Sequence, residues 1–367
     1  MEYLVKFNAM NRAIQECHKV DEIKLIRDKA EAWRYILIQA KASSEYVRMA
    51  EEIKLNAERK AGGIIKELQE QGELQKPGGD RKSFFEPPRM IPTLKEKDIT
   101  FRQSFDWQKI DGIPNKDYFK YIKTQYEKKK QITTSGAVSL AKEIERENLR
   151  NELALEGKEI KLTDSDIQLI NDDFREVDIE ENSIDLVFTD PPYTGEDLDL
   201  WSDLSEFANK VLKPSSFLVT YAGHMYLPTL LNNLSEHLIY YWELCLYLPG
   251  EPHWVLGRNI GGQWRSILVF QKEPFRKLDK IVNDYLENDV RQKSLHPWQQ
   301  GEDGAGKLIE RFSKEGDLIC DPMMGSGTFP YVAYKMKRRA IGIEINEEDF
   351  NISKGRITSQ GLVKQSV

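Results

Sequence analysis

The apolar run 184–189 ends directly in Asp190, Pro191, Pro192 and Tyr193. A short, continuous apolar run predicts a strand that is buried on both faces, as in a parallel sheet covered by helices. Such a strand would carry an acid, two ring-locked carbonyl groups and an aromatic ring into a cleft at its carboxyl end. This stretch therefore predicts an α/β fold and places a site at its end.

The composition is that of a globular protein of about two domains. The chain has 367 residues, of which 40 % are hydrophobic and 31 % are charged. No run is apolar enough to cross a bilayer, and the start, MEYLVKFNAMNR, lacks the core of a signal peptide. We therefore expect a cytoplasmic protein of a bacterium or a phage-infected host.

Cys17, Cys245 and Cys320 have no paired spacing, which predicts buried thiols and no metal site.

The net charge of −7 is unevenly spread along the chain. Residues 1–160 contain 31 Lys and Arg against 27 Asp and Glu, whereas the remainder contains 22 against 33. The most basic stretch is 76–130. A basic region on an acidic protein is typical of a nucleic-acid-binding protein whose contact with nucleic acid is confined to that region. The solvated surface of a helical domain gives the same charge pattern.

Residues 9–72 are rich in Ala, Glu, Lys, Leu and Ile and contain no proline, which predicts helices. Asp21 is the expected N-cap of one helix, and a second is expected over 46–68. We interpret residues 1–75 as a helical hairpin and a candidate for homodimerisation. The Gly- and Pro-rich stretch 72–92 predicts a linker or loop.

Short helices are expected next, with Thr100 as the N-cap of one of them. Their ranges are 93–98, 100–110, 117–129 and 137–156. The spacing fits a helix–turn–helix, so residues 76–160 are interpreted as a DNA-binding segment, although any small helical bundle produces the same spacing. The candidate base-edge readers are Arg102, Gln103 and Gln108, and the candidate phosphate contacts are Lys95, Lys97 and Lys109.

From residue 167 the pattern changes to short apolar strands separated by helices, which is typical of an α/β sheet. Residues 161–367 are expected to form one domain with a mostly parallel, seven-stranded sheet. The strands are expected at 167–171, 184–189, 217–221, 238–248, 266–271, 318–320 and 339–344. The helices are expected at 200–212, 224–234, 303–314 and 328–337.

A second motif follows the strand at 318–320 and leads into a helix. It reads Asp321, Pro322, Met323, Met324, Gly325, Ser326, Gly327 and Thr328. Glycines at such a turn let the backbone approach a ligand, and the helix N-terminus offers free N–H groups. The next strand ends in Glu344, where Rossmann-like folds bind a ribose. These features predict a site for an adenosyl cofactor; a nicotinamide dinucleotide would also fit.

Asp-Pro-Pro-Tyr after a strand, followed about 130 residues later by Asp-Pro-x-x-Gly-Ser-Gly-Thr, resembles the motif pair of the DNA amino-methyltransferases that use S-adenosylmethionine. The catalytic motif comes first, which resembles the beta class of that family. The similarity covers residues 165–357. It implies a Rossmann-like methyltransferase sheet, S-adenosylmethionine as cofactor and double-stranded DNA as partner.

The resemblance also assigns roles to individual residues. The tetrapeptide 190–193 would be catalytic. The implied cofactor-binding residues are Asp172, Asp173, Asp190, His296, Pro297, Asp321, Pro322, Met323, Gly325, Ser326, Gly327, Thr328, Glu344 and Asn346. The family pattern is broken at Gln300 and Gly301, where a lysine and a second proline are usual, and at Met323, where phenylalanine is frequent.

The chemistry of the target explains the first motif. An exocyclic base amine is a weak nucleophile because its lone pair is delocalised into the ring. Asp190 would accept one amine proton and the Pro191 carbonyl the other, so that the nitrogen attacks the sulfonium methyl directly. Tyr193 would stack on the base once it has left the duplex. An aspartate in the first position resembles the adenine-directed members of the family.

The glycine-rich stretch 251–264 is a candidate wall of the base pocket. His253, Trp254 and Arg258 are its candidate contacts with DNA, and an ordinary surface loop is the alternative. In the beta class that the chain resembles, a target-recognition region commonly lies between the catalytic half and the histidine–proline segment at 296–297. Here only about residues 272–295 are available for it, too few for a separate domain. Sequence recognition is therefore assigned to the N-terminal helices.

Three functions stay open at this point. The first is a site-specific DNA adenine methyltransferase, solitary or paired with a restriction nuclease. The second keeps the enzyme but changes the target to RNA or to the amino group of cytosine. The third is a non-catalytic regulator that binds DNA through 76–130. Carbon-5 methylation of cytosine is disfavoured because no cysteine follows a proline.

Overall fold

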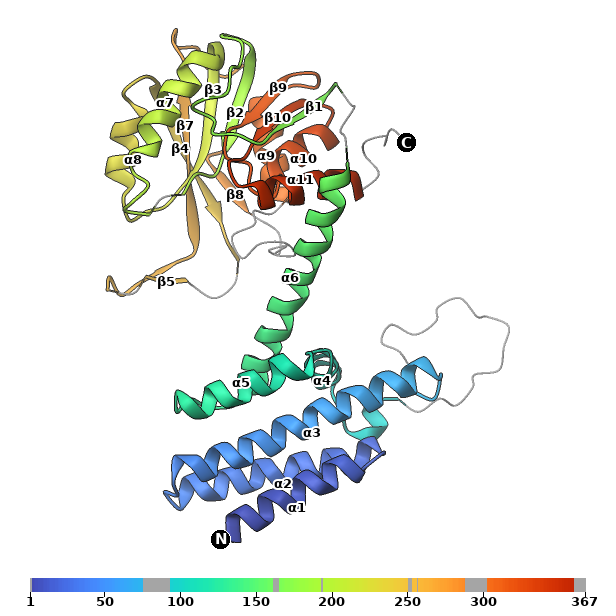
Figure 1. The fold of residues 1–367 in the computed structure, drawn as a ribbon. Helices are drawn as coiled ribbons and strands as arrows, with labels where there is room; N and C mark the ends of the chain where they lie inside the picture. The colour runs from blue at the N-terminus through green and yellow to red at the C-terminus, as the bar shows by residue number, and fades with distance from the viewer. Residues whose placement is uncertain are drawn as a thin grey trace. The chain divides into compact units, whose positions relative to one another are not determined.

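The computed structural model describes residues 2–74, 93–160, 165–192, 194–249, 253–255, 257–287 and 302–359. The chain divides into two compact units, Met1–Glu145 and Arg146–Val367 (Figure 1). This division differs from the predicted boundaries at residues 75 and 160, because helices on both sides of residue 75 share one hydrophobic core. Some predicted features lie outside the described residues, namely Tyr193, His296, Pro297 and the linker from residue 75 on.

The helical unit begins with three helices in place of the predicted hairpin of two. They are α1 Glu2–Glu16, α2 Val20–Gln39 and α3 Ser44–Glu70. α2 starts directly after Lys19, whose backbone is extended. The prediction that Asp21 is the N-cap is therefore wrong; Asp21 is an acid in the first turn, where the helix dipole favours a negative charge.

The later elements of this unit follow the predicted order. They are the 3₁₀ turn η1 Lys95–Lys97, α4 Phe101–Asp111, α5 Asn115–Glu127 and the start of α6 Thr134–Glu159. Thr100 is confirmed as the N-cap of α4 and forms a capping box with Gln103. Trp107 of α4 is buried in one cluster with residues of α1, α2 and α3, so α4 belongs to the same core as the first three helices.

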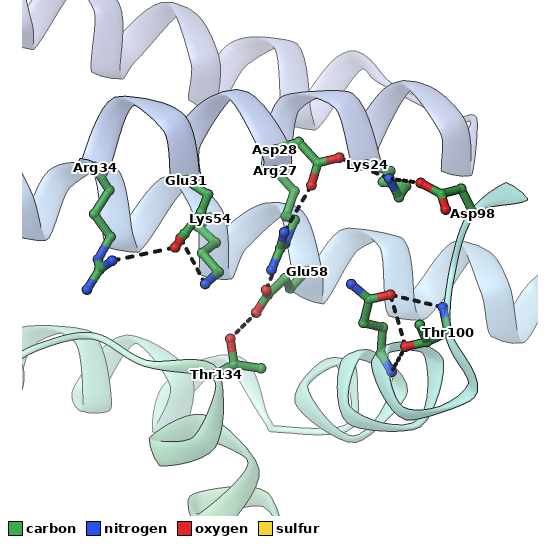
Figure 2. Close-up of polar contacts among 11 residues, drawn as sticks. Lys24, Arg27, Asp28, Glu31, Arg34, Lys54, Glu58, Asp98, Thr100 and Thr134 are labelled. Atoms are coloured by element: carbon green, nitrogen blue, oxygen red, sulfur yellow. Dashed lines mark hydrogen bonds and ion pairs between the residues drawn. The ribbon is translucent and has the colours of Figure 1, made fainter. Parts of the chain in front are cut away.

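Buried charges join α2, α3 and the start of α6 (Figure 2). Glu58 of α3 is 1 % exposed and accepts hydrogen bonds from Arg27 Nε (3.1 Å) and from the hydroxyl of Thr134 (2.6 Å). Glu51, which precedes Glu58 on the same face of α3, accepts a hydrogen bond from Arg34 Nε of α2 (3.0 Å). A buried carboxylate is tolerated only when its oxygens are paired, so these contacts specify how the three helices meet.

The second unit contains an eight-stranded sheet in the order β1-β10-β9-β2-β3-β7-β4-β8. Every strand of this sheet runs in the same direction except β7. The strands are β1 Ile167–Ile170, β2 Ile184–Thr189, β3 Leu212–Ala222, β4 Ile239–Tyr247, β7 Trp264–Gln271, β8 Tyr285–Glu287, β9 Leu318–Asp321 and β10 Arg339–Ile343. The predicted strands are all present. The predicted number of seven omits β8, whose three residues are too few to show the alternation of apolar and polar residues that marks a strand.

Helices cover both faces of this sheet (Figure 1). α7 Leu200–Val211 and α8 Leu227–Leu234 pack on one face, and α9 Glu302–Phe312 and α10 Thr328–Lys335 pack on the other. Consecutive β2 residues alternate between the two faces, as Val187 and Phe188 do. The continuous apolar run is thus buried on both sides, as expected of a central parallel strand.

Two features of this unit were not predicted. α11 Glu347–Ser359 follows β10, and its Ile352 packs on Leu153 of α6. Part of the glycine-rich stretch is a hairpin of β5 His253–Val255 and β6 Ile260–Gly262, instead of an irregular loop. In the ranges that the structure describes, no helix is long and apolar enough to span a membrane.

Candidate active site

Four neighbouring parallel strands end in or beside an acid. Across the sheet these are Asp172 after β1, Glu344 after β10, Asp321 at the end of β9 and Asp190 after β2. The carboxyl ends of parallel strands meet at one edge of the sheet, and ligands of open α/β sheets bind outside that edge. The topology therefore gathers acids that are far apart in the sequence.

Asp321 links the two motifs directly. It is 2 % exposed, and its Oδ1 accepts hydrogen bonds from the Thr189 hydroxyl (2.7 Å) and the Met323 N–H (3.1 Å). Burial raises the pKa of the Asp321 carboxyl to about 8; the charges of Glu344 and Asp190 add to the rise, and the two hydrogen bonds oppose it. The carboxyl is therefore protonated at neutral pH and joins β9 to β2 as a largely uncharged group.

This pKa predicts a pH-dependent stability. The folded carboxyl keeps its proton up to about pH 8, whereas its ordinary pKa is 3.8, so the folded state binds more protons between these values. The contribution of Asp321 to stability is complete below the ordinary pKa and is lost as pH rises through the folded one. We expect Asp321→Asn, which keeps an accepting oxygen for Thr189, to flatten the fall of the urea midpoint between about pH 4 and pH 8. Equal slopes in both proteins would contradict this assignment.

The turn between β9 and α10 depends on two glycines with left-handed backbone. The φ angles of Gly325 and Gly327 are +51° and +74°. A Cβ on Gly327 would lie 2.7 Å from the Cβ of Ser353 in α11, so the turn and α11 approach too closely for a side chain. The Gly325 N–H donates to Glu344 Oε2 (2.8 Å), which ties the turn to the end of β10. Strand, glycine turn and helix are thus arranged as the motif predicts.

A buried arginine that the sequence reading missed supports this turn. Arg356 of α11 is 3 % exposed, and its Nη1 donates to the Thr328 hydroxyl (2.8 Å) and the Ser326 carbonyl (3.3 Å). Its Nη2 donates to Glu302 Oε1 (3.0 Å). Burial lowers the pKa of Arg356, and Glu302 opposes the change. Nothing near Arg356 in the sequence signals this role, because all its partners come from other elements.

The acid beyond β10 is held by backbone groups. Glu344 Oε1 accepts a hydrogen bond from the Asn346 N–H (2.8 Å), and burial raises the pKa of its carboxyl. The Asn346 side-chain oxygen accepts from the N–H groups of Glu348 (2.9 Å) and Asp349 (3.0 Å). The Asn346 side chain therefore accepts hydrogen bonds from free N–H groups in the first turn of α11, while its backbone N–H orients the carboxylate of Glu344.

The two acids after β1 have different surroundings. Asp173 forms an ion pair with Arg175, which lowers the pKa of this carboxyl, and Arg175 also pairs with Asp203 of α7 (3.2 Å). Asp172 is exposed, and its Oδ1 accepts from the Asp173 N–H (2.8 Å). Of these two predicted cofactor-binding residues, Asp172 is thus the more accessible to a ligand.

Asp190 lies beside a cation contributed by the antiparallel strand. Arg265 Nη1 is 3.9 Å from Asp190 Oδ2, and the Arg265 guanidinium is 5.7 Å from the ring centre of buried Tyr221. Because β7 runs against its neighbours, its first residues lie at the edge where the parallel strands end. The Trp201 Nε1–H of α7 donates to the Pro192 carbonyl (2.9 Å) and holds the backbone after Asp190.

Three stacked aromatic rings lie in the core beside the strand that ends at Asp190. Phe188 of β2 lies 4.1 Å from Phe329 of α10, with the ring planes 16° apart. Tyr221 of β3 lies 5.6 Å from Phe329 at 9°. The three rings are buried and join the strand that carries Asp190 to the helix that follows the glycine turn. The two halves of the site therefore share a rigid apolar base.

Removal of the Arg265 cation should impair the site without unfolding it. We expect Arg265→Gln to lower the rate of the methyl transfer that the sequence motifs predict by about tenfold, equal to roughly 1.4 kcal/mol, and to leave cofactor affinity nearly unchanged. Arg265→Lys should restore part of the rate because it restores the charge. Rate constants from single-turnover assays, with cofactor affinity from calorimetry, provide the measurement. A loss of cofactor affinity equal to the loss of rate would contradict a role confined to Asp190.

Most of the polar side chains of η1 and α4 that were expected to contact DNA have partners inside the helical unit. Arg102 pairs with Asp106 (2.8 Å), Lys109 with Glu145, and Lys97 with Asp21 (3.2 Å). Gln103 takes part in the capping box, and Gln108 Nε2 donates to the Ser104 hydroxyl (2.9 Å). The remaining candidates are exposed: Lys95, and Trp254 and Arg258 on the hairpin.

The fold and the site define an α/β protein with a Rossmann-like sheet, acids on adjacent strand ends and a glycine turn at the ligand edge. The DNA methylase family matches residues 184–355. Type II methyltransferase M.HpaI of Haemophilus parainfluenzae is 30 % identical over 226 residues, which cover 50 % of this chain and 70 % of that protein. The chain therefore belongs to the DNA amino-methyltransferase family.

Other known proteins are similar over about half of the chain. Type II methyltransferase M.BglII of Bacillus subtilis is 24 % identical over 236 residues, which cover 48 % of this chain and 64 % of that protein. The solved structure of the M1.HpyAVI–SAM complex is 21 % identical, with a TM-score of 0.42, over 52 % of this chain and 99 % of that one. The cytosine-N4-specific PvuII DNA methyltransferase is 21 % identical, with a TM-score of 0.44, over 54 % and 92 %.

Proposed function

We propose that this protein transfers a methyl group from S-adenosylmethionine to the N6 amino group of adenine in DNA, at a defined sequence. The observation that carries the proposal is the position of Asp190 on the strand next to Asp321 and its glycine turn. A base-holding acid and a cofactor cradle on adjacent strand ends suit direct transfer between two bound molecules. Aspartate as the first residue of the tetrapeptide resembles adenine-directed members of the family.

The glycine turn at 325–327, the N-terminus of α10 and Glu344 fit an adenosyl cofactor. The described part of α10 has no side-chain cap at its N-terminus, and the glycines before it leave its first N–H groups open to a ligand. The Glu344 carboxylate accepts the backbone N–H groups of Gly325 and Asn346 and retains capacity for a further hydrogen bond, as a ribose hydroxyl requires. When bound, S-adenosylmethionine supplies an electrophilic methyl group on a sulfonium centre.

The protein's own part in the reaction is to position the amine and accept its proton. Asp190 accepts a hydrogen bond from the amino group, and the Pro191 carbonyl accepts the second. Both contacts draw the nitrogen out of conjugation with the ring and raise its nucleophilicity. Asp190 would then receive the proton that the nitrogen loses as its bond to the methyl carbon forms and the sulfur–methyl bond breaks, which leaves a neutral thioether. Arg265 holds the carboxylate in place, and Trp201 fixes the backbone through the Pro192 carbonyl.

The test is methyl transfer from labelled S-adenosylmethionine to unmethylated bacterial DNA, followed by digestion to nucleosides. We expect the label in N6-methyl-2′-deoxyadenosine only. Label in N4-methyl-2′-deoxycytidine would overturn the choice of base and keep the amino-methyltransferase chemistry. Label in RNA alone, offered in a parallel reaction, would overturn DNA as the substrate.

A further inference from the structure

The exposed face of α5 has the side chains of a nucleic-acid contact. Lys116, Lys120 and Lys123 recur at intervals of four and three residues, so they lie on one face of the helix, and all three are exposed. Phe119 lies between them and is 63 % exposed. On the other side of α5, Tyr118 is buried in the core of the helical unit.

The charge of this face is largely unbalanced. Residues 115–130 contain six lysines and two acids. Lys123 pairs with Glu127 at 3.8 Å, a distance at which an exposed pair is weak. Within the part of the chain that the structure describes, Lys116 and Lys120 form no ion pair, and neither do the lysines at 128–130. Unpaired lysines leave a positive surface that attracts phosphate groups.

The arrangement of α4 and α5 also favours α5 as the contacting helix. The helices are joined by the short turn 112–114, and α4 is seen nearly end-on in Figure 1 whereas α5 lies across the view, so the two cross. In such a motif the second helix presents its exposed face to DNA. Lys116 and Lys123 are about 10 Å apart along the axis at 1.5 Å per residue, which is within the major-groove width of about 12 Å.

We propose that the α5 face, defined as Lys116, Phe119, Lys120 and Lys123, binds double-stranded DNA. The lysines contact phosphates on either side of a groove, and the ring of Phe119 makes apolar contact inside it. This places a DNA contact outside the methyltransferase unit and on a different helix from the α4 residues expected from the sequence. The choice of duplex DNA as the partner rests on the proposed function.

The experiment measures binding of the full chain to a labelled DNA duplex of mixed sequence by fluorescence anisotropy, between about 50 and 200 mM salt. The test variant combines Lys116→Gln, Lys120→Gln and Lys123→Gln. The matched control combines Lys6→Gln, Lys19→Gln and Lys41→Gln, which removes the same charge from exposed positions in α1 and in the turns before and after α2. A labelled RNA duplex of the same sequence is titrated in parallel.

The test variant should bind DNA at least about tenfold more weakly, and its slope of log affinity against log salt should fall by about three, near 0.9 for each lost phosphate contact. Phe119→Ala should weaken binding without changing this slope. The control should resemble the unmodified protein. An unchanged slope in the test variant, an equal loss in the control, or tighter binding to RNA would overturn the proposal.

Methylation assays separate this inference from the proposed function. If Asp190→Asn abolishes methylation and keeps the α5-dependent DNA binding, both ideas are supported. DNA binding that depends on α5 in a protein without methyl-transfer activity would support this inference and defeat the proposed function. Normal methylation of DNA by the test variant, at unchanged KM for DNA, would defeat the inference and keep the proposed function.

Discussion

Replacement of Asp190 by asparagine is expected to reduce methyl transfer by about 10³-fold, within the range that a positioned proton acceptor contributes. The amide is close in size to the carboxylate, but it loses the negative charge and cannot take the amine proton. Asp190 is only partly buried and follows β2, so the core of the sheet should stay intact. Label incorporation from S-adenosylmethionine into DNA measures the rate.

Asp178→Asn is the matched control, because Asp178 is an exposed acid in the loop between β1 and β2. It should leave the rate unchanged. Asp190→Asn should also bind S-adenosylmethionine and DNA with affinities near those of the unmodified protein. A variant that still methylates DNA at a normal rate would show that Asp190 is not the proton acceptor and would leave a regulator or another catalytic group to be considered.

Gly327→Ala is expected to remove most of the affinity for S-adenosylmethionine and to destabilise the fold by about 3 kcal/mol. Two costs combine here. A non-glycine residue is strained at a φ of +74°, and the new Cβ would lie 2.7 Å from the Cβ of Ser353. Relief of the contact requires the turn or α11 to move, which displaces the N-terminus of α10. Calorimetric titration with the cofactor and urea unfolding provide the measurements.

Gly316 provides a control that separates these two costs. Its φ is +85°, and a Cβ there would meet no atom within 4 Å among the described residues. Gly316→Ala should therefore cost only the strain of the left-handed backbone, about 1 kcal/mol, and should keep cofactor affinity. If Gly327→Ala behaved like Gly316→Ala in both measurements, the close approach of α11 to the turn would have no functional consequence.

The strands of the sheet and the acids that end them were largely predictable. The run 184–189 is apolar at four of its six positions, and the structure buries it between two layers of helices. The turn at 325–327 needs glycine for a local reason, namely its backbone angles. Such features follow from residues that are adjacent in sequence, and a single chain displays them directly.

The partners of charged groups were not predictable in the same way. Arg102 and Lys109 have the composition of DNA-contacting residues, but they pair with Asp106 and Glu145. Conversely, Lys116 and Lys120 lie in the basic stretch 76–130 but were not among the individual DNA contacts predicted from it, and they are exposed on α5. Whether a cation is neutralised depends on which helix packs beside it, and helical periodicity does not contain that information.

The sequence by itself determined that this chain has a parallel sheet with Asp190 and Asp321 at strand ends, because apolar runs and the turns after them are local properties. Only the tertiary structure decided that these strands are neighbours, that Arg265 reaches Asp190 from the antiparallel strand, and that Arg356 supports the glycine turn. The physical reason is that strand order and helix packing bring together residues from distant parts of the chain. Their contacts are set by the burial of the whole core, which no local pattern specifies.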